Sequence, residues 1–370
     1  MTVFAVVTGG GTSGHVVPAV AILESLVDSG VPVDQLAYVG SRRGAERTVV
    51  PPLGFRCEFL PISGLQRSVS PRALALNIAL PFRLLRSTLR ARALLRSWKP
   101  AVVVSVGGYA SEPMARAAAS AGTPVVCVSY DRSPGLATRR QARTATACAV
   151  AFEGSALPNA VVTGAPVRSA VRRMDSAAVR ADVRREMGLD EGTSLVTVVG
   201  GSLGSAVLND AVADIAAALD GAGLRAVIHH VTGPRFFVAP DRRRTGSVEA
   251  RLVAHDPELP RMLAASDVVV SRAGASTVAE IAALGAVGVL VPWPGAADDH
   301  QTANARWLSD AGAAVLVAES ATTGPDVASE VVRLCSDDVA RSAISSRARE
   351  MGARNRSGAL VEVIRNAATC

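Results

Sequence analysis

At 370 residues the chain is long enough for two domains of ordinary size, and its 49 % hydrophobic share supports a buried core in each. The net charge is +7, but aromatic residues make up only 4 %, too few for a base-stacking surface, so we expect no nucleic-acid partner. Five scattered cysteines without a C-x-x-C pair argue against a disulfide framework and against zinc, and indicate a reduced compartment. The sequence has no signal leader and no uncharged run of the ~18 residues that span a bilayer. We therefore expect a cytoplasmic protein.

Short β-branched runs alternate with alanine-rich helical stretches, which predicts parallel sheets covered on both faces. The predicted strands lie at 4–8, 35–40, 101–106, 124–128, 194–200, 226–231, 267–271 and 287–292, and a further strand ends near 163. Residues 101–128 resemble residues 267–292, and the loop at 6–14 resembles that at 198–205. This repetition predicts an α/β protein of two Rossmann-like domains, 1–165 and 166–345, whose sheets face each other across a cleft. The last helix, about 345–370, is expected to pack back on the first domain.

The segment 71–100 differs from the rest of the chain because leucine, isoleucine and phenylalanine are interleaved there with arginine. A basic amphipathic segment suits an anionic membrane surface. The alternative is an ordinary helix that buries its leucines and leaves its arginines in water.

The first glycine-rich loop fits the dinucleotide fingerprint G-x-G-x-x-G at Gly9, Gly11 and Gly14. Dinucleotide binding needs an acid at the end of the next strand, but that strand ends in Gly-Ser-Arg-Arg, so NAD is not expected. Arg42 and Arg43 suit an NADP phosphate, yet no constellation for hydride transfer follows.

His15 stands directly after that loop, at a predicted helix N-terminus. The helix dipole disfavours the imidazolium form there, so the neutral ring can accept a proton as a general base. The alternative is a histidine that only caps or packs the helix.

Further candidate loops follow other predicted strands. Gly107–Ser111 can line the same cleft, and Gly200–Ser205 places Ser202 where it can donate to a phosphate. Small residues at 273–277 let a helix N-terminus approach a diphosphate, with Glu280 one turn further on to bind ribose hydroxyls. His300, Gln301 and Asn304 suit sugar hydroxyls and an N-acetyl group. Asp298 and Asp299 are interpreted as helix-capping residues, and no metal site is predicted.

In this order, the motifs GGGTSGHVVPA, GGYASEP, PNAVVTGAPVR, GGSLGSAVLN, SDVVVSRAGASTVAEIAALG and DDHQTANA resemble the MurG family. Its members are bacterial N-acetylglucosaminyltransferases that convert lipid I into lipid II in peptidoglycan synthesis. The resemblance runs almost end to end. It implies a GT-B fold, UDP-GlcNAc as the donor substrate, and an inverting transfer that needs no metal or other cofactor.

The resemblance also implies roles for individual residues. Arg168, Gly201 and Ser202 would contact the nucleotide diphosphate, Ser276 and Thr277 would add helix-end contacts to phosphate, and Glu280 would bind the ribose. His300, Gln301 and Asn304 would bind the GlcNAc, and His15 would deprotonate the acceptor hydroxyl. The acceptor side would comprise Thr12, Gly14, Gly108, Tyr109, Ser111 and Asp131. Segment 71–100 coincides with the family's membrane patch, which implies a peripheral position on the inner face of the cell membrane.

The chain departs from the family at specific places. The family's His-Glu-Gln-Asn is replaced by Val128, Ser129, Tyr130 and Asp131, Glu112 stands where glycine is usual, and Leu203 replaces glutamine. The donor side is nearly intact, whereas two acceptor-side loops have changed. One alternative is therefore a GlcNAc transferase with another acceptor, in nucleoside, peptide or lipid-linked antibiotic biosynthesis. A UDP-GlcNAc 2-epimerase and a sugar-nucleotide-binding protein without catalysis are further alternatives.

Overall fold

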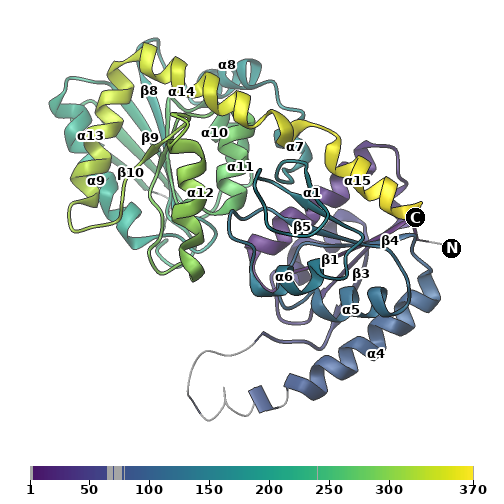
Figure 1. Ribbon diagram of the computed structural model, residues 1–370. Coiled ribbons are helices and arrows are strands. Elements are labelled where there is room, and N and C mark those ends of the chain that lie inside the picture. Colours follow the sequence, from purple (N-terminus) through teal and green to yellow (C-terminus); the bar gives the residue numbers. More distant parts are fainter. Residues whose placement is uncertain (1–2, 65–69, 71–76, 79, 240, 370) are drawn as a thin grey trace. The chain divides into compact units, whose positions relative to one another are not determined.

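The computed structural model describes residues 3–64, 70, 77–78, 80–239 and 241–369. The chain folds into two compact units (Figure 1). Unit 1 comprises Met1–Ser169 together with Ser357–Cys370, and unit 2 comprises Ala170–Arg356. Unit 1 thus extends a few residues beyond position 165 and includes the C-terminal helix Ala359–Ala368. The prediction of one last helix over about 345–370 was wrong, because residues 345–351 are the end of another helix, Asp338–Met351, which belongs to unit 2.

Seven strands of unit 1, among its described residues, form one parallel sheet in the order β3-β2-β1-β4-β5-β6-β7. Its central strands are runs of valine and alanine that are fully buried, as expected of a sheet covered on both faces. The strands are β1 (Ala5–Thr8), β2 (Leu36–Ser41), β3 (Arg56–Leu60), β4 (Val102–Ser105), β5 (Val125–Ser129), β6 (Ala147–Val150) and β7 (Ala160–Val162).

Helices cover both faces of this sheet. One core cluster joins the sheet to α4 and α5, while α15 lies against α1 and strands β4 to β6 (Figure 1). The helices are α1 (Ser13–Asp28), α2 (Glu46–Val49), α4 (Leu80–Trp98), α5 (Glu112–Ser120), α6 (Leu136–Ala142) and α15 (Ala359–Ala368). The loops that begin α1 and α5 therefore emerge at the carboxyl ends of β1 and β4, where α/β proteins bind ligands.

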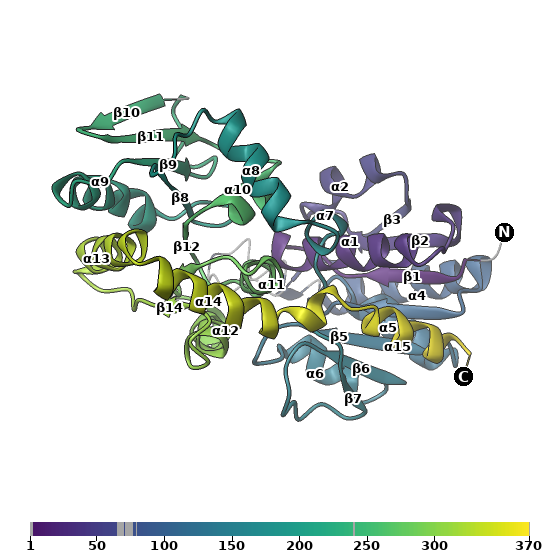
Figure 2. The ribbon, with the colours of Figure 1, turned by 90° about the horizontal axis from the view of Figure 1, so that it is seen from above.

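Unit 2 repeats the same strand order, β11-β9-β8-β12-β13-β14, and adds β10 at one edge. Every described pair in this sheet is parallel except β10 with β11, which form an antiparallel hairpin (Figure 2). The strands are β8 (Ser194–Val199), β9 (Ala226–Val231), β10 (Asp241–Thr245), β11 (Val248–Val253), β12 (Val268–Ser271), β13 (Gly288–Leu290) and β14 (Val315–Leu316).

Two core clusters lie on opposite faces of the second sheet. The larger packs α9 and α13 against the sheet, and the smaller packs α8 and α10 on the other side (Figure 2). The helices are α7 (Ser169–Arg172), α8 (Ser176–Glu186), α9 (Ala206–Gly221), α10 (Leu259–Ala265), α11 (Ala275–Leu284), α12 (His300–Ser309), α13 (Thr323–Ser336) and α14 (Asp338–Met351). None of the helices in the described part of the chain is long and apolar enough to cross a bilayer.

All the predicted strands are present, but the prediction missed β3, β6, β10, β11 and β14. β10 reads DRRRT and is exposed throughout, so it carries no hydrophobic signal. β14 has only two residues, too few for a periodic pattern. The expectation of purely parallel sheets was wrong for β10, because a short hairpin turn joins it to β11.

Candidate functional site

The first glycine-rich loop of unit 1 places His15 in the first turn of α1. Thr12 is the N-cap residue, and its side chain does not cap the backbone. Its hydroxyl lies instead 3.0 Å from Nδ1 of His15. When Nδ1 donates this hydrogen bond, Nε2 is left with a lone pair, which is the tautomer that a general base requires. The half-buried ring of His15 is thus held in one orientation by Thr12, three residues before it.

Tyr130 connects this loop to two others. Its hydroxyl lies 3.0 Å from the carbonyl oxygen of Gly14 and 3.2 Å from that of Val106, and it donates to both. Its ring meets the ring of His15 edge to face, with 6.3 Å between centroids. Burial, followed by the charge of Asp131, raises the pKa of Tyr130 well above its ordinary value, so the phenol stays protonated and remains a donor.

The second glycine-rich loop of unit 1 lies beside His15. A Cβ added at Gly108 would stand 3.1 Å from Cδ2 of His15, so a side chain there would press on the ring. Tyr109 packs against Gly11 in the same way. The structure therefore brings Thr12, Gly14, Gly108 and Tyr109 around His15, as a common acceptor-side site requires.

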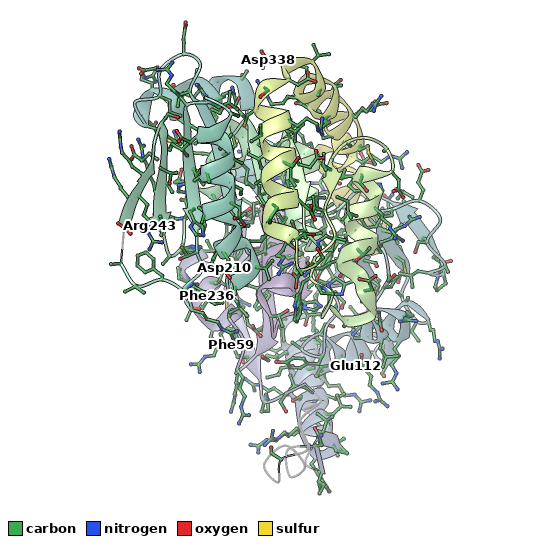
Figure 3. The ribbon with its side chains drawn as sticks, turned by 90° about the vertical axis from the view of Figure 1, so that its left-hand side faces the viewer. Phe59, Glu112, Asp210, Phe236, Arg243 and Asp338 are labelled. Atoms are coloured by element: carbon green, nitrogen blue, oxygen red, sulfur yellow. The ribbon has the colours of Figure 1, made fainter. Side chains whose placement is uncertain are left out.

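Ser111 and Glu112 belong to a hydrogen-bond network centred on Gln141. The Ser111 hydroxyl donates to the carbonyl of Gly108 at 2.9 Å, and Gln141 donates to Ser111 at 2.9 Å and to Glu112 at 3.0 Å. Glu112, labelled in Figure 3, is the first residue of α5 and lines a pocket with Arg116 and Arg140. The carboxylate that stands where the family has glycine is thus partnered within its own unit. Asp131, the remaining acceptor-side candidate, follows Tyr130 and is half-buried.

In unit 2, Arg272 connects the loops that follow three strands. Its guanidinium donates to the Ser205 hydroxyl at 2.8 Å and to the Val291 carbonyl at 3.1 Å. It also forms an ion pair with Glu319 at 2.5 Å, and only 11 % of its side chain is exposed. Since Ser205 is the N-cap of α9, Arg272 fixes the position of the loop 200–205, which carries Gly201 and Ser202.

The N-terminus of α11 carries a buried hydroxyl that no described residue of the protein satisfies. Gly274 is the N-cap and provides no capping side chain. Within the described chain, Oγ of Ser276 is buried and has no hydrogen-bond partner. A buried polar atom of this kind calls for an explanation, and a bound ligand is one. Thr277 lies beside it in the first turn, and Glu280 lies one turn further along, with Glu280 half-buried.

The residues predicted to bind the sugar lie in the first half of α12. Each forms a hydrogen bond within the protein. His300 donates from Nδ1 to the Ala297 carbonyl at 2.6 Å, which leaves Nε2 as an acceptor. Oε1 of Gln301 accepts the Trp293 N–H at 3.0 Å, so its amide nitrogen remains to donate. Asn304 is fully buried and donates weakly, at 3.5 Å, to the Ala273 carbonyl. Asn304 therefore joins α12 to the start of α11.

The predicted helix-capping role of Asp298 and Asp299 was wrong. Both residues have left-handed backbone conformations, with φ of 53° and 49°. Asp299 occupies the N-cap position of α12 but makes no side-chain cap; it accepts the Thr302 hydroxyl at 2.7 Å instead. Among the described residues, no group of three or more His, Cys, Asp or Glu side chains is arranged to hold a metal ion.

His230 braces the end of β9 next to loop 200–205. Its Nε2 donates to Asn209 on α9 at 2.9 Å, and Asn209 donates to the Thr232 carbonyl at 3.0 Å. Burial, then the positive charge of Arg243 on the exposed strand β10 (Figure 3), lowers the pKa of His230 to about 4. The ring is therefore neutral near pH 7, and the role it plays is structural.

Arg168 lies in a different unit from the other residues predicted to bind the donor substrate. It belongs to unit 1, where its guanidinium pairs with Glu24 of α1 at 2.7 Å and 2.9 Å. Ser169 donates to the same carboxylate from its backbone N–H at 2.8 Å.

The sequence did not predict the residues that hold these loops: Tyr130, Gln141, Arg272, Glu319, and Glu46, which accepts the Gly11 N–H at 3.1 Å. The position of Arg272 could have been noticed, because it is a single charged residue between a buried strand and Gly274. Tyr130 and Gln141 had no such signal, since their partners are more than 20 residues away in sequence.

Two Rossmann-like units, each with glycine-rich loops and helix N-termini at the carboxyl ends of its parallel strands, define a two-domain fold of the GT-B class. The chain belongs to glycosyltransferase family 28. Residues 5–150 match the family's N-terminal domain model and residues 195–357 match its C-terminal domain model.

Relatives and solved structures agree with this assignment. A Clavibacter sepedonicus protein is 35 % identical over 368 residues, covering 99 % of this chain and 97 % of its own. A Desulforudis audaxviator protein is 33 % identical and covers 97 % of both chains. Both are named UDP-N-acetylglucosamine–N-acetylmuramyl-(pentapeptide) pyrophosphoryl-undecaprenol N-acetylglucosamine transferase. The crystal structure of Acinetobacter baumannii MurG shares the fold, with a TM-score of 0.73, 24 % identity, and coverage of 98 % of this chain and 99 % of that one.

Replacing Tyr130 by phenylalanine tests its connecting role. We expect the free energy of unfolding to fall by about 1–3 kcal/mol, because two loop carbonyls lose their donor inside the protein. Urea denaturation measures this value. The matched control is Tyr109→Phe, whose hydroxyl has no hydrogen-bond partner among the described residues and whose loss should leave the unfolding free energy unchanged. Equal effects of the two substitutions would contradict the connecting role.

Proposed function

We propose that this protein transfers N-acetylglucosamine from UDP-GlcNAc to a hydroxyl of the N-acetylmuramyl group on a lipid-linked pyrophosphate, with inversion at the sugar C1. Full-length relatives named for that reaction support the substrate pair. The observation that supports the donor half is the buried Ser276 hydroxyl at the start of α11, which has no hydrogen-bond partner among the described residues.

On this proposal unit 2 binds the donor. The first-turn N–H groups of α11, the Ser276 hydroxyl and loop 200–205 donate to the diphosphate, and Glu280 accepts from the ribose. Nε2 of His300 and the free amide nitrogen of Gln301 face the sugar. Asn304 is fully buried, so it acts by holding the start of α11 rather than by direct contact with the GlcNAc.

Unit 1 supplies the base. The acceptor oxygen attacks C1 of GlcNAc as the bond from C1 to the UDP oxygen breaks, and Nε2 of His15 takes the acceptor's proton. Negative charge grows on the leaving diphosphate, where the α11 N-terminus and Ser276 stabilise it. One well-placed donor in such a role contributes roughly 2.7–4 kcal/mol.

A second candidate shares the donor but differs in its acceptor. It is favoured by Tyr130 and Asp131, which occupy the loop where the family has His-Glu-Gln-Asn. The exposed apolar side chains of α4 support the lipid-linked acceptor instead.

An acceptor screen with UDP-GlcNAc separates these candidates. We expect UDP release with a lipid I analogue, and loss of at least 100-fold in kcat for His15→Ala, because the base contributes about 10²–10⁴-fold. UDP release only with soluble sugars, peptides or nucleosides would establish the second candidate. Formation of UDP-ManNAc without any acceptor would reject both candidate functions and show that the protein is an epimerase.

Ser276→Ala tests the donor site, and two measurements should change in opposite directions. Removing an unsatisfied buried hydroxyl should raise the melting temperature slightly, while the loss of a donor to phosphate should weaken UDP binding roughly tenfold. Calorimetry and thermal unfolding measure the two effects. Ser87→Ala is the matched control, since the Ser87 hydroxyl is also buried with no partner in the described part of the chain but lies on α4 of unit 1. Unchanged UDP affinity in Ser276→Ala would remove this residue from the donor site.

The helix α4 supports a membrane-bound acceptor. Its inner face buries Ala91, Leu94, Leu95 and Trp98. Its outer face exposes Phe82, Leu85 and Leu89 at 76 %, 60 % and 54 %, in line with Ile78 just before it. Exposed Arg86, Arg92 and Arg96 lie on the same helix, along the outside of unit 1 (Figure 1). We propose that this stripe inserts into an anionic bilayer surface. Residues 71–76 and 79 of the predicted segment lie outside the described part of the chain.

Phe82→Ser combined with Leu89→Ser should weaken binding to vesicles of anionic phospholipid at least tenfold. Each buried apolar side chain of this size contributes about 1.5–3 kcal/mol. Sedimentation with vesicles measures the binding. Leu136→Ser is the control, because Leu136 is 66 % exposed in unit 1 but lies on α6. If the double variant sediments as the wild type does, α4 is not the membrane contact.

A further inference from the structure

A buried carboxylate lies beneath the first glycine-rich loop. Glu46, the first residue of α2, is fully inaccessible to solvent. Its Oε1 accepts both the N–H and the hydroxyl of Ser41 at 2.8 Å. Both of its oxygens lie 3.1 Å from the N–H of Gly11. No cation pairs with Glu46 in the described part of the chain, so neutral donors hold the charge.

Glycines make room for this carboxylate. A Cβ at Gly44 would lie 1.7 Å from Oε2, and one at Gly10 would lie 2.4 Å from Oε1. Gly10 also has a φ of +130°, which L side chains rarely adopt. A Cβ at Gly40, near the end of β2, would lie 2.8 Å from Cγ of Glu46. The loop and the strand end are thus shaped around the carboxylate.

Tyr38 stabilises the same loop from the side of β2. Its hydroxyl donates to the carbonyl of Gly9 at 2.7 Å. Burial, followed by the charge of Glu46, raises the pKa of Tyr38, so it remains a protonated donor. Donors from Ser41 and Gly11 therefore converge on Glu46, while Tyr38 fixes the carbonyl just before them.

We propose that Glu46 is a positioning residue that serves as an internal anion for the acceptor-side glycine loop. Glycine-rich loops at helix N-termini ordinarily bind an external phosphate through their N–H groups. Here the N–H of Gly11 is already satisfied by the chain itself. The acceptor pyrophosphate is therefore not bound by this N–H, and Glu46 fixes the loop so that Thr12 and His15 face the acceptor hydroxyl, a role that rests on the proposed function.

Glu46→Gln and Glu46→Ala test this role in the full-length protein. Glutamine fills the same volume but turns an amide nitrogen toward a buried N–H, so kcat should fall roughly tenfold while the KM for UDP-GlcNAc stays within about twofold. In Glu46→Ala, formate should enter the vacated site, raise the melting temperature in a saturable way, and restore part of kcat. Glu362→Gln, on an exposed position of α15 in the same unit, is the control and should match the wild type.

Wild-type kcat in Glu46→Gln would overturn the inference, as would an alanine variant that neither gains thermal stability nor regains activity with formate. If both Glu46 variants fail to fold, Gly44→Ala keeps the charge but displaces the carboxylate, and it should lower kcat by a similar factor. Full activity in Gly44→Ala would then overturn the inference. Failure of the wild type to use a lipid I analogue would reject the proposed function alone, because the formate-dependent rise in melting temperature needs no acceptor.

Discussion

The carbonyl of Gly14 faces a position in α1 that has no N–H, because the residue four places further on is Pro18. A helix normally satisfies that carbonyl from within, but here the hydroxyl of Tyr130 donates to it from another loop. The same hydroxyl reaches Val106, at the end of β4, and the ring of Tyr130 meets His15. Tyr130 therefore links the loops after β1, β4 and β5, which leave the carboxyl ends of neighbouring parallel strands. The histidine and the proline of the GHVVP stretch are linked through this contact.

In unit 2 a charged side chain, rather than a phenol, links the loops at the ends of the strands. Arg272 satisfies the Ser205 hydroxyl and the Val291 carbonyl while pairing with Glu319, so one buried guanidinium connects the loops after β8, β13 and β14. Arginine suits this task because its planar group donates in several fixed directions at once. The cost of burying such a charge is offset only because Glu319 lies against it.

The order of strands and glycine loops could be predicted from the sequence because buried parallel strands form continuous apolar runs. The hydrogen-bond and ion-pair partners within each site could not be predicted from the sequence. Asn304 is one of the predicted sugar-binding residues, yet it is fully buried and donates to the Ala273 carbonyl. Glu112 stands where the family has glycine, and Gln141, on a different helix, donates a hydrogen bond to its carboxylate. Such pairs depend on which helices pack side by side in the fold, and the local spacing of residues does not indicate that.

The two units also differ in what occupies their glycine-rich loops, and this difference explains why the G-x-G-x-x-G fingerprint misleads. In unit 1 the N–H of Gly11 is satisfied by Glu46, an acid that follows the second strand but turns inward instead of toward a ribose. In unit 2 the start of α11 carries a buried hydroxyl with no partner among the described residues. A helix N-terminus attracts an anion most strongly where its donors are still unsatisfied. The loop of unit 1 is therefore partly satisfied by its own chain, whereas the start of α11 keeps an unsatisfied hydroxyl among the described residues.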